Sequence, residues 1–156
     1  MDITIVQAKP VDAENILLLQ QMAYQSEALL YQDDSIPALQ QTLESLRAQF
    51  TNTLLLKASL AEGRIVGSVR GHVVGNTCHV GRLIVHPNFQ RRGIGSDLLN
   101  ALERQFPDIT RFELFTGHKS AGNLRLYRRH GYQEYRRDPI HAGLTMIYLE
   151  KHQTRT

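Results

Sequence analysis

Residues 80 to 96 read VGRLIVHPNFQRRGIGS, and this stretch decides which fold the rest of the chain must complete. It begins as a strand, with Leu83 and Val85 on one face. Two arginines and two glycines follow, and from Ile94 onward apolar residues recur at helical spacing. The stretch therefore predicts a strand, a short glycine-containing turn and the start of a helix.

A turn of this kind can hold an anion. The first turn of a helix has unpaired N–H groups and the positive end of the helix dipole. Gly93 and Gly95 lack a Cβ that would keep a phosphate from the backbone, and Arg91 and Arg92 can add charge-assisted contacts. A Walker loop needs a Gly-Lys step that is absent, and the dinucleotide fingerprint needs a glycine where Leu98 stands. An ordinary turn before a core helix remains the alternative.

The elements on either side complete the order βααβββαβαββ. Apolar alternation and turn residues predict strands at 3–8, 53–61, 64–74, 77–85, 112–116, 132–136 and 144–151. Helical spacing predicts helices after Asp12, from Ser35 to Phe50, from 94 to 106, and from Ser120 to a stop at Gly131. Hairpins in the middle and crossovers around the later strands predict an α/β (α+β) fold with a mixed sheet.

Two details of this arrangement are open to test. In the third strand Ile65 and Val69 share one face, whereas Ser68 and Arg70 occupy the other, which predicts a sheet with one face buried. The polar segment 24–34 is expected to be a connection between the first two helices.

Composition bounds the class of protein. The chain has 156 residues, 42% hydrophobic and 21% charged, which predicts one domain over 1–151 and a short polar tail at 152–156. Cys78 is the only cysteine, so no internal disulfide forms and a reducing compartment is expected. The first residues are unlike a secretory signal, and no apolar run reaches about 18 residues. We expect a soluble cytoplasmic protein without membrane association.

Two motifs carry a resemblance to a known family. Residues 90–95, QRRGIG, resemble the Gln/Arg-x-x-Gly-x-Gly/Ala motif of the GNAT superfamily of N-acetyltransferases, and the strand before them is similar to the one that precedes that motif. Residues 126–132, LYRRHGY, are similar to a second signature, Leu-Tyr-x-x-x-Gly-Phe/Tyr. The resemblance implies a mostly antiparallel sheet of about seven strands flanked by about four helices.

The resemblance also implies a site for acetyl-CoA as co-substrate, with no metal. In that family the first motif wraps the pyrophosphate, and the strand before it offers backbone groups to the pantetheine arm and acyl carbonyl. Many relatives have asparagine where Ser120 stands, so Asn123 is the candidate cofactor-contacting amide, with Ser120 left open. The implied cofactor-binding residues are Leu83, Ile84, Val85, Gln90, Arg91, Arg92, Gly93, Ile94, Gly95, Ser96, Asn123 and Tyr127.

The implied reaction is direct attack of a primary amine, on a small molecule or a peptide, at the thioester carbonyl. A free N–H of the strand at 83–85 could stabilise the oxyanion. Tyr127 is the candidate general acid, because the leaving thiol has a pKa near that of cysteine, about 8.5, against about 10 for tyrosine. The candidate bases are not ranked by sequence; they are Glu113, His79, His72 and Glu27.

Two rival functions remain. Arginine pairs at 91–92, 128–129 and 136–137 could bind nucleic acid, although the net charge is only +3 and no aromatic-basic interleaving accompanies them. A non-catalytic acyl-CoA sensor of the same fold is the other. The acidic segment 24–34 could attract a cationic amine or be an exposed loop. The sequence leaves open whether the protein forms a homodimer.

Overall fold

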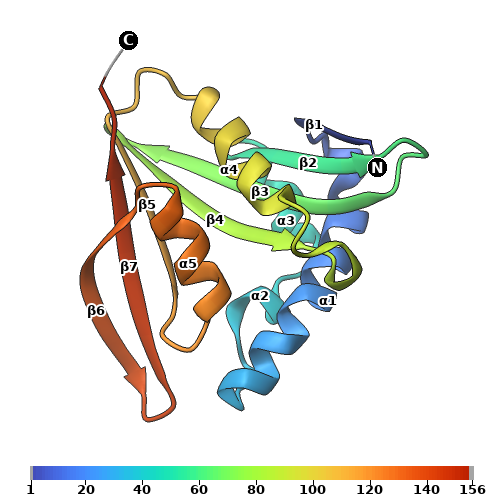
Figure 1. Cartoon of the computed structure of the whole chain (residues 1–156). Helices are drawn as coiled ribbons and strands as arrows, with labels where there is room; N and C mark the ends of the chain where they lie inside the picture. Colours follow the sequence, from blue (N-terminus) through green and yellow to red (C-terminus); the bar gives the residue numbers. More distant parts are fainter. Residues whose placement is uncertain (1, 155–156) are drawn as a thin grey trace.

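A seven-stranded sheet organises the protein, with strand order β1-β2-β3-β4-β5-β7-β6 (Figure 1). The computed structural model describes residues 2–154. Every neighbouring pair of strands is antiparallel except β4 and β5, which are parallel. The strands are β1 (Ile3–Gln7), β2 (Leu54–Leu60), β3 (Ile65–Val74), β4 (Thr77–Val85), β5 (Arg111–Gly117), β6 (Gln133–His141) and β7 (Leu144–His152). The predicted mixed, mostly antiparallel sheet is confirmed.

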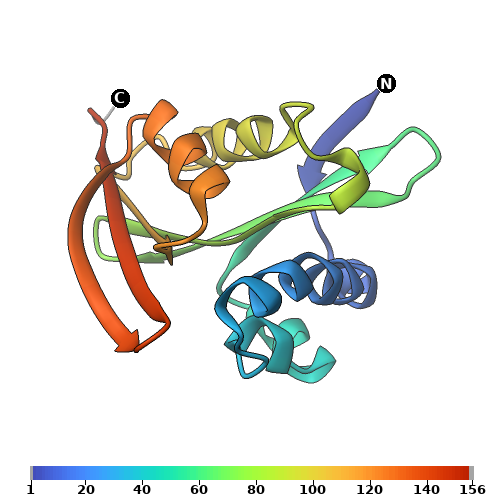
Figure 2. The same cartoon turned by 60° about the horizontal axis from the view of Figure 1, so that its bottom comes forward.

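Helices cover the sheet on both faces, as Figure 2 shows. On one side lie α4 (Ile94–Arg104) and α5 (Ala121–Arg129). On the other lie α1 (Ala13–Tyr31), α2 (Pro37–Gln40) and α3 (Leu43–Gln49). The larger core, which includes Leu98, Leu102 and Phe112, lies on the α4 side, and a smaller core around Ile16 and Leu46 lies under α1. Five helices thus stand where the sequence predicts about four.

The prediction of a sheet buried on one face was wrong. Ser68 is 0% exposed and Arg70 is 6% exposed, because α1 to α3 cover the polar face of β3. Polar partners satisfy most of these groups: the Ser68 hydroxyl donates to the carbonyl of Leu56 at 2.9 Å, and the two terminal nitrogens of Arg70 donate to Gln49 and Gln20, each at 2.7 Å. Burial and the nearby Arg82 lower the pKa of Arg70 to about 10. Because glutamine side chains accept hydrogen bonds from Arg70, the polar face of β3 can be buried under the helices.

Replacing Gln20 by leucine is expected to lower the free energy of unfolding by about 3 kcal/mol, because it leaves a buried guanidinium nitrogen without an acceptor. Within residues 2–154, Arg70 Nε is already the one buried side-chain nitrogen or oxygen without a partner. Urea unfolding measures the change. Gln25→Leu, on the exposed side of the same helix, is the control. Equal stability of the two variants would show that Gln20 does not support Arg70.

Two predicted helical boundaries were also wrong. The segment expected as a connection from residue 24 belongs largely to α1, which continues to Tyr31 because no glycine or proline interrupts it. The predicted second helix is divided into α2 and α3. Gln41 is extended, and the Thr42 side chain accepts a hydrogen bond from Ser45 N at 3.1 Å, which starts a new helix.

The end of β7 lies beyond the predicted domain boundary. His152 is still in the strand, and the Gln153 side chain donates to the carbonyls of Phe106 and Ile109 at 2.8 and 2.6 Å. Residues 155 and 156 of the predicted tail lie outside the described residues. No helix within residues 2–154 has the length and apolar character needed to cross a membrane.

Candidate active site

The sheet opens between β4 and β5. The two strands pair only at their beginnings, where the partners are Thr77 with Arg111, Cys78 with Phe112 and His79 with Glu113. Beyond these pairs the strands diverge into a V (Figure 1). A bulge in β4 accompanies the divergence, with Arg82 in the left-handed region at φ 48°. The edge of β4 that faces β5 is therefore left without a strand partner along its second half.

The loop from β4 to α4 closes one end of this opening. A short 3₁₀ turn, Pro87–Phe89, leads into Arg91 and Gly93, whose φ angles of 63° and 83° lie in the left-handed region. Gly93 is suited to that conformation because it has no Cβ. Asp97 is the first helical residue whose N–H bonds back, to Gly93 O at 2.9 Å, and no such bond is recorded in the described chain for the N–H groups of Gly95 and Ser96. Anion binding at this helix start stays a prediction, which these N–H groups and the left-handed loop support.

Between these elements lies a groove of about 870 Å³, within the usual size range of ligand sites. It contains most of the predicted cofactor-binding residues. Those that line it are Leu83, Ile84, Val85, Gln90, Arg91, Gly93, Ile94, Gly95, Ser96 and Asn123. Arg92 lies beside it, with its guanidinium 5.2 Å from the centre of the Phe89 ring.

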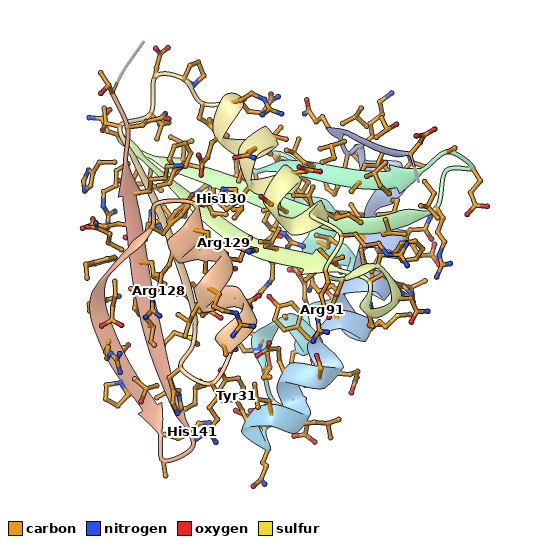
Figure 3. The ribbon with its side chains drawn as sticks, viewed as in Figure 1. Tyr31, Arg91, Arg128, Arg129, His130 and His141 are labelled. Carbon is orange, nitrogen blue, oxygen red and sulfur yellow. The ribbon has the colours of Figure 1, made fainter. Side chains whose placement is uncertain are left out.

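Two walls of the groove lie outside the predicted cofactor-binding residues, although Glu27 is a candidate base and segment 24–34 a candidate for attracting an amine. One is the middle of α1, and the other is the outer face of α5. The additional lining residues are Ala23, Tyr24, Ser26 and Glu27 from α1, Phe89 from the loop, and Gly122, Arg125, Leu126 and Arg129 from α5. The four-residue spacing of Arg125 and Arg129 is a signal that the sequence does contain, because it places both on one helical face. Figure 3 shows Arg91 on the loop and Arg129 on α5.

Asn123 and Ser120 occupy different surroundings. Asn123 lines the groove, and its amide donates to the Thr116 hydroxyl at 3.4 Å. Ser120 is 6% exposed and is not a lining residue. Its hydroxyl is instead bonded to Tyr31 and Glu27.

Tyr127 is a buried residue of α5 rather than a wall of the groove. It belongs to the larger core, with its ring centre 6.2 Å from that of Tyr132. Burial, together with the neighbouring Tyr24 and Glu27, raises the pKa of Tyr127 well above its ordinary value. The hydroxyl therefore stays protonated at neutral pH, and its electrostatic neighbours lie on the groove-lining part of α1.

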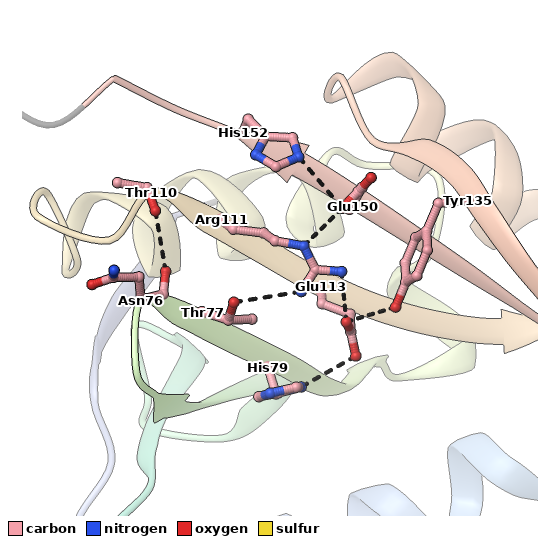
Figure 4. A network of polar contacts seen from close by, with 9 residues as sticks. All are labelled: Asn76, Thr77, His79, Thr110, Arg111, Glu113, Tyr135, Glu150 and His152. Atoms are coloured by element: carbon pink, nitrogen blue, oxygen red, sulfur yellow. Dashed lines mark hydrogen bonds and ion pairs between the residues drawn. The ribbon is translucent and has the colours of Figure 1, made fainter.

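Glu113 lies away from the groove, in the network of Figure 4. Its carboxylate pairs with Arg111 at 2.7 Å and with His79 at 3.3 Å, and it accepts a hydrogen bond from Tyr135 at 2.6 Å. Burial tends to raise the pKa of Glu113, but the hydrogen bonds from Tyr135 and Arg111 hold it below its usual value. The structure does not bring Glu113 or His79 together with the predicted cofactor residues.

Of the two remaining candidate bases, one lies outside the groove and the other lines it. His72 lies at the end of β3 and is 3.1 Å from the carbonyl of Asn52, outside the groove. Glu27 is the one candidate base that lines the groove.

The arginines of the last predicted pair, at 136 and 137, contact Tyr148 and Glu134 on the β6–β7 hairpin.

Comparison with known proteins places this architecture in a family. The family model described as "Acetyltransferase (GNAT) family" matches residues 19–132. The chain is 28% identical over 122 residues to the UPF0157 protein YqkA of Bacillus subtilis. That match covers 78% of this chain but only 35% of the relative, so the chain spans about a third of the length of this curated relative.

Solved structures show the same fold. The PaiA N-acetyltransferase of Thermoplasma acidophilum, in complex with coenzyme A, matches with a TM-score of 0.82 at 17% identity, over 98% of this chain and 100% of that one. The ribosomal-protein-S18-alanine N-acetyltransferase of Escherichia coli matches with a TM-score of 0.80 at 18% identity, over 97% and 94% of the two chains. The likeness to these structures shows the fold. The chain belongs to the acetyltransferase (GNAT) family.

Proposed function

We propose that the protein transfers the acetyl group of acetyl-CoA to a primary amine of a small molecule or peptide. The observation that carries this proposal is the groove between the diverging β4 and β5, which ends at the left-handed loop before α4. A thioester in the opening would reach the unpaired edge of β4, and a pyrophosphate would reach the start of α4.

The loop and α5 supply what a CoA phosphate requires. N–H groups of the first turn of α4 and the positive end of its dipole attract an anion. Arg91, Arg125 and Arg129 line the same groove and add positive charge. A Cβ on Gly95 would lie 3.2 Å from the Leu126 side chain and 3.9 Å from that of Val85, so a residue larger than glycine would fill this end of the groove.

The chain also offers groups for the transfer itself. An N–H on the free edge of β4 donates to the carbonyl oxygen as negative charge develops there. Tyr127, protonated at neutral pH, gives its proton to the leaving sulfur. No metal-binding group of His, Cys, Asp and Glu side chains occurs among the described residues.

Incubation of the protein with acetyl-CoA and a panel of amines tests the proposal. The panel contains polyamines, amino sugars, amino acids and peptides with free N-termini, and thiol release with mass detection of the acetylated product is the measurement. We expect turnover with at least one class. Binding of acetyl-CoA without turnover on any amine would favour a sensor, and salt-dependent binding of oligonucleotides without binding of acetyl-CoA would favour a nucleic-acid partner.

A further inference from the structure

A chain of hydrogen bonds ends on Glu27, an acidic residue that lines the groove. It links α1, whose last residue is Tyr31, to the segment between β5 and α5 (Figure 3). Lys119 N lies 3.0 Å from the Tyr31 hydroxyl, which lies 2.8 Å from the Ser120 hydroxyl. The Ser120 hydroxyl in turn lies 2.9 Å from Glu27 Oε2.

Hydrogen-bond chemistry fixes the direction of this chain. A backbone N–H only donates and a carboxylate only accepts, so Lys119 N donates to Tyr31 and Ser120 donates to Glu27. The one proton left for the middle contact is that of Tyr31, which must therefore donate to Ser120. Burial raises the pKa of Tyr31, which keeps that proton in place. Every donor in the chain thus points toward one oxygen of Glu27.

The Tyr31 side chain is tightly packed against the end of β5. A Cβ on Gly117 would collide with the hydroxyl and ring carbons of Tyr31, so the tyrosine crosses the end of β5 only because residue 117 is glycine. Tyr31 is 6% exposed and Ser120 is 6% exposed. These hydrogen bonds are consequently buried and form a fixed support for Glu27, rather than a set of mobile surface contacts.

Side chains of both charges line the groove. Arg91, Arg125 and Arg129 are the cationic residues that line it, and Glu27 is the one acidic residue among the described residues that do so. Ser120 holds Oε2, and no hydrogen bond in the described chain occupies Oε1. Tyr24, on the preceding turn of α1, also lines the groove, with the guanidinium of Arg82 6.0 Å from the centre of its ring. The groove therefore offers cationic side chains that suit a phosphate and one carboxylate, that of Glu27, which suits an ammonium group.

We infer that Glu27 binds the ammonium group of the acceptor amine and accepts its proton, and that Tyr31 and Ser120 are positioning residues that hold this carboxylate. The inference rests on the proposed acetyl transfer. Transfer of a proton from R–NH3⁺ to Glu27 leaves a neutral amine, which forms the N–C bond as the C–S bond breaks. Tyr127 protonates the sulfur and recovers a proton from the acylated nitrogen, and Glu27 later releases its proton to water.

Binding of n-propylammonium to the protein saturated with CoA tests the ammonium site without requiring turnover. Two-dimensional 1H–15N NMR should show shifts of the Glu27, Lys119 and Ser120 amides that saturate with n-propylammonium and are absent with n-propanol. Glu27→Gln should raise the Kd roughly 10- to 100-fold, since a charge-assisted hydrogen bond is lost. Glu14→Gln, the same change at an exposed position of the same helix, should leave the Kd unchanged.

The support is tested by kinetics with whichever amine the panel identifies. Ser120→Ala and Tyr31→Phe should each lower kcat/KM for the amine about 3- to 10-fold while KM for acetyl-CoA stays constant, and Ser120→Thr should restore activity because it keeps the hydroxyl. Absence of saturable shifts at these amides, or an unchanged Kd in Glu27→Gln, would overturn the ammonium site. Equal loss in Ser120→Thr and Ser120→Ala would overturn the positioning role. Failure to bind acetyl-CoA would instead refute the proposed function.

Discussion

Replacement of Gly95 by glutamate is expected to weaken acetyl-CoA binding by at least about 100-fold, because it places bulk and negative charge at the proposed pyrophosphate position. Gly95 lies in the first turn of α4 and lines the groove. An acidic residue in the first turn of a helix is favoured by the helix dipole, so the free energy of unfolding should change by less than about 1 kcal/mol. Isothermal titration calorimetry with acetyl-CoA measures the loss.

Asn100→Glu is the matched control for this variant. It adds the same charge to the same helix at an exposed position outside the groove. The control should bind acetyl-CoA within about twofold of the wild type, as expected for a solvent-screened surface charge. Tight binding by the Gly95 variant would place the pyrophosphate somewhere other than the start of α4.

Removal of the Tyr127 hydroxyl, by Tyr127→Phe, is expected to lower kcat by about 10²- to 10⁴-fold, the usual contribution of a general acid. The Kd for acetyl-CoA should stay nearly constant, because phenylalanine keeps the ring of Tyr127 packed in the larger core. Tyr132→Phe removes the neighbouring hydroxyl, which donates to Glu103 at 2.9 Å, and should affect stability but not kcat. Stopped-flow acetylation with the amine from the panel separates the two variants. Similar kcat values in both would exclude Tyr127 as the proton donor.

The pH dependence of kcat follows from the same residue. A general acid works only while it is protonated, so the activity that depends on it is lost as pH rises through its pKa. Burial and the neighbouring Tyr24 and Glu27 raise the pKa of Tyr127 above its ordinary value of 10.0. Titration of Tyr127 should therefore cause no fall in kcat below pH 10. Such a fall, abolished by Tyr127→Phe, would show a less buried hydroxyl.

The loop before α4 could be predicted from sequence because its signals are local. The apolar period changes at Ile94, and Gly93 takes the positive φ that glycine favours. The hairpins formed by β2, β3 and β4 could also be predicted, from their turns and their alternation. Glu113 could also have been assigned to the face opposite the core, since it alternates with Phe112 and Leu114, which are buried.

The arrangement of α1 around the groove could not be predicted because it depends on tertiary packing. Arg70 reads as a solvent-facing residue until α1 to α3 bury it among glutamines. Tyr24 and Glu27 read as part of a polar connection, yet α1 carries them to the groove. The divergence of β4 from β5 was not predicted, although the bulge in β4 changes its core-facing residues from Cys78 and Val80 to Leu83 and Val85. These long-range arrangements decide which side chains share the groove.

A crystal structure of the protein with bound CoA tests the central claim most directly. The account predicts the pyrophosphate within hydrogen-bond distance of the backbone N–H groups at residues 93–96, and the thiol end in the opening between β4 and β5. A pyrophosphate bound away from the start of α4, or a thiol outside that opening, would contradict it.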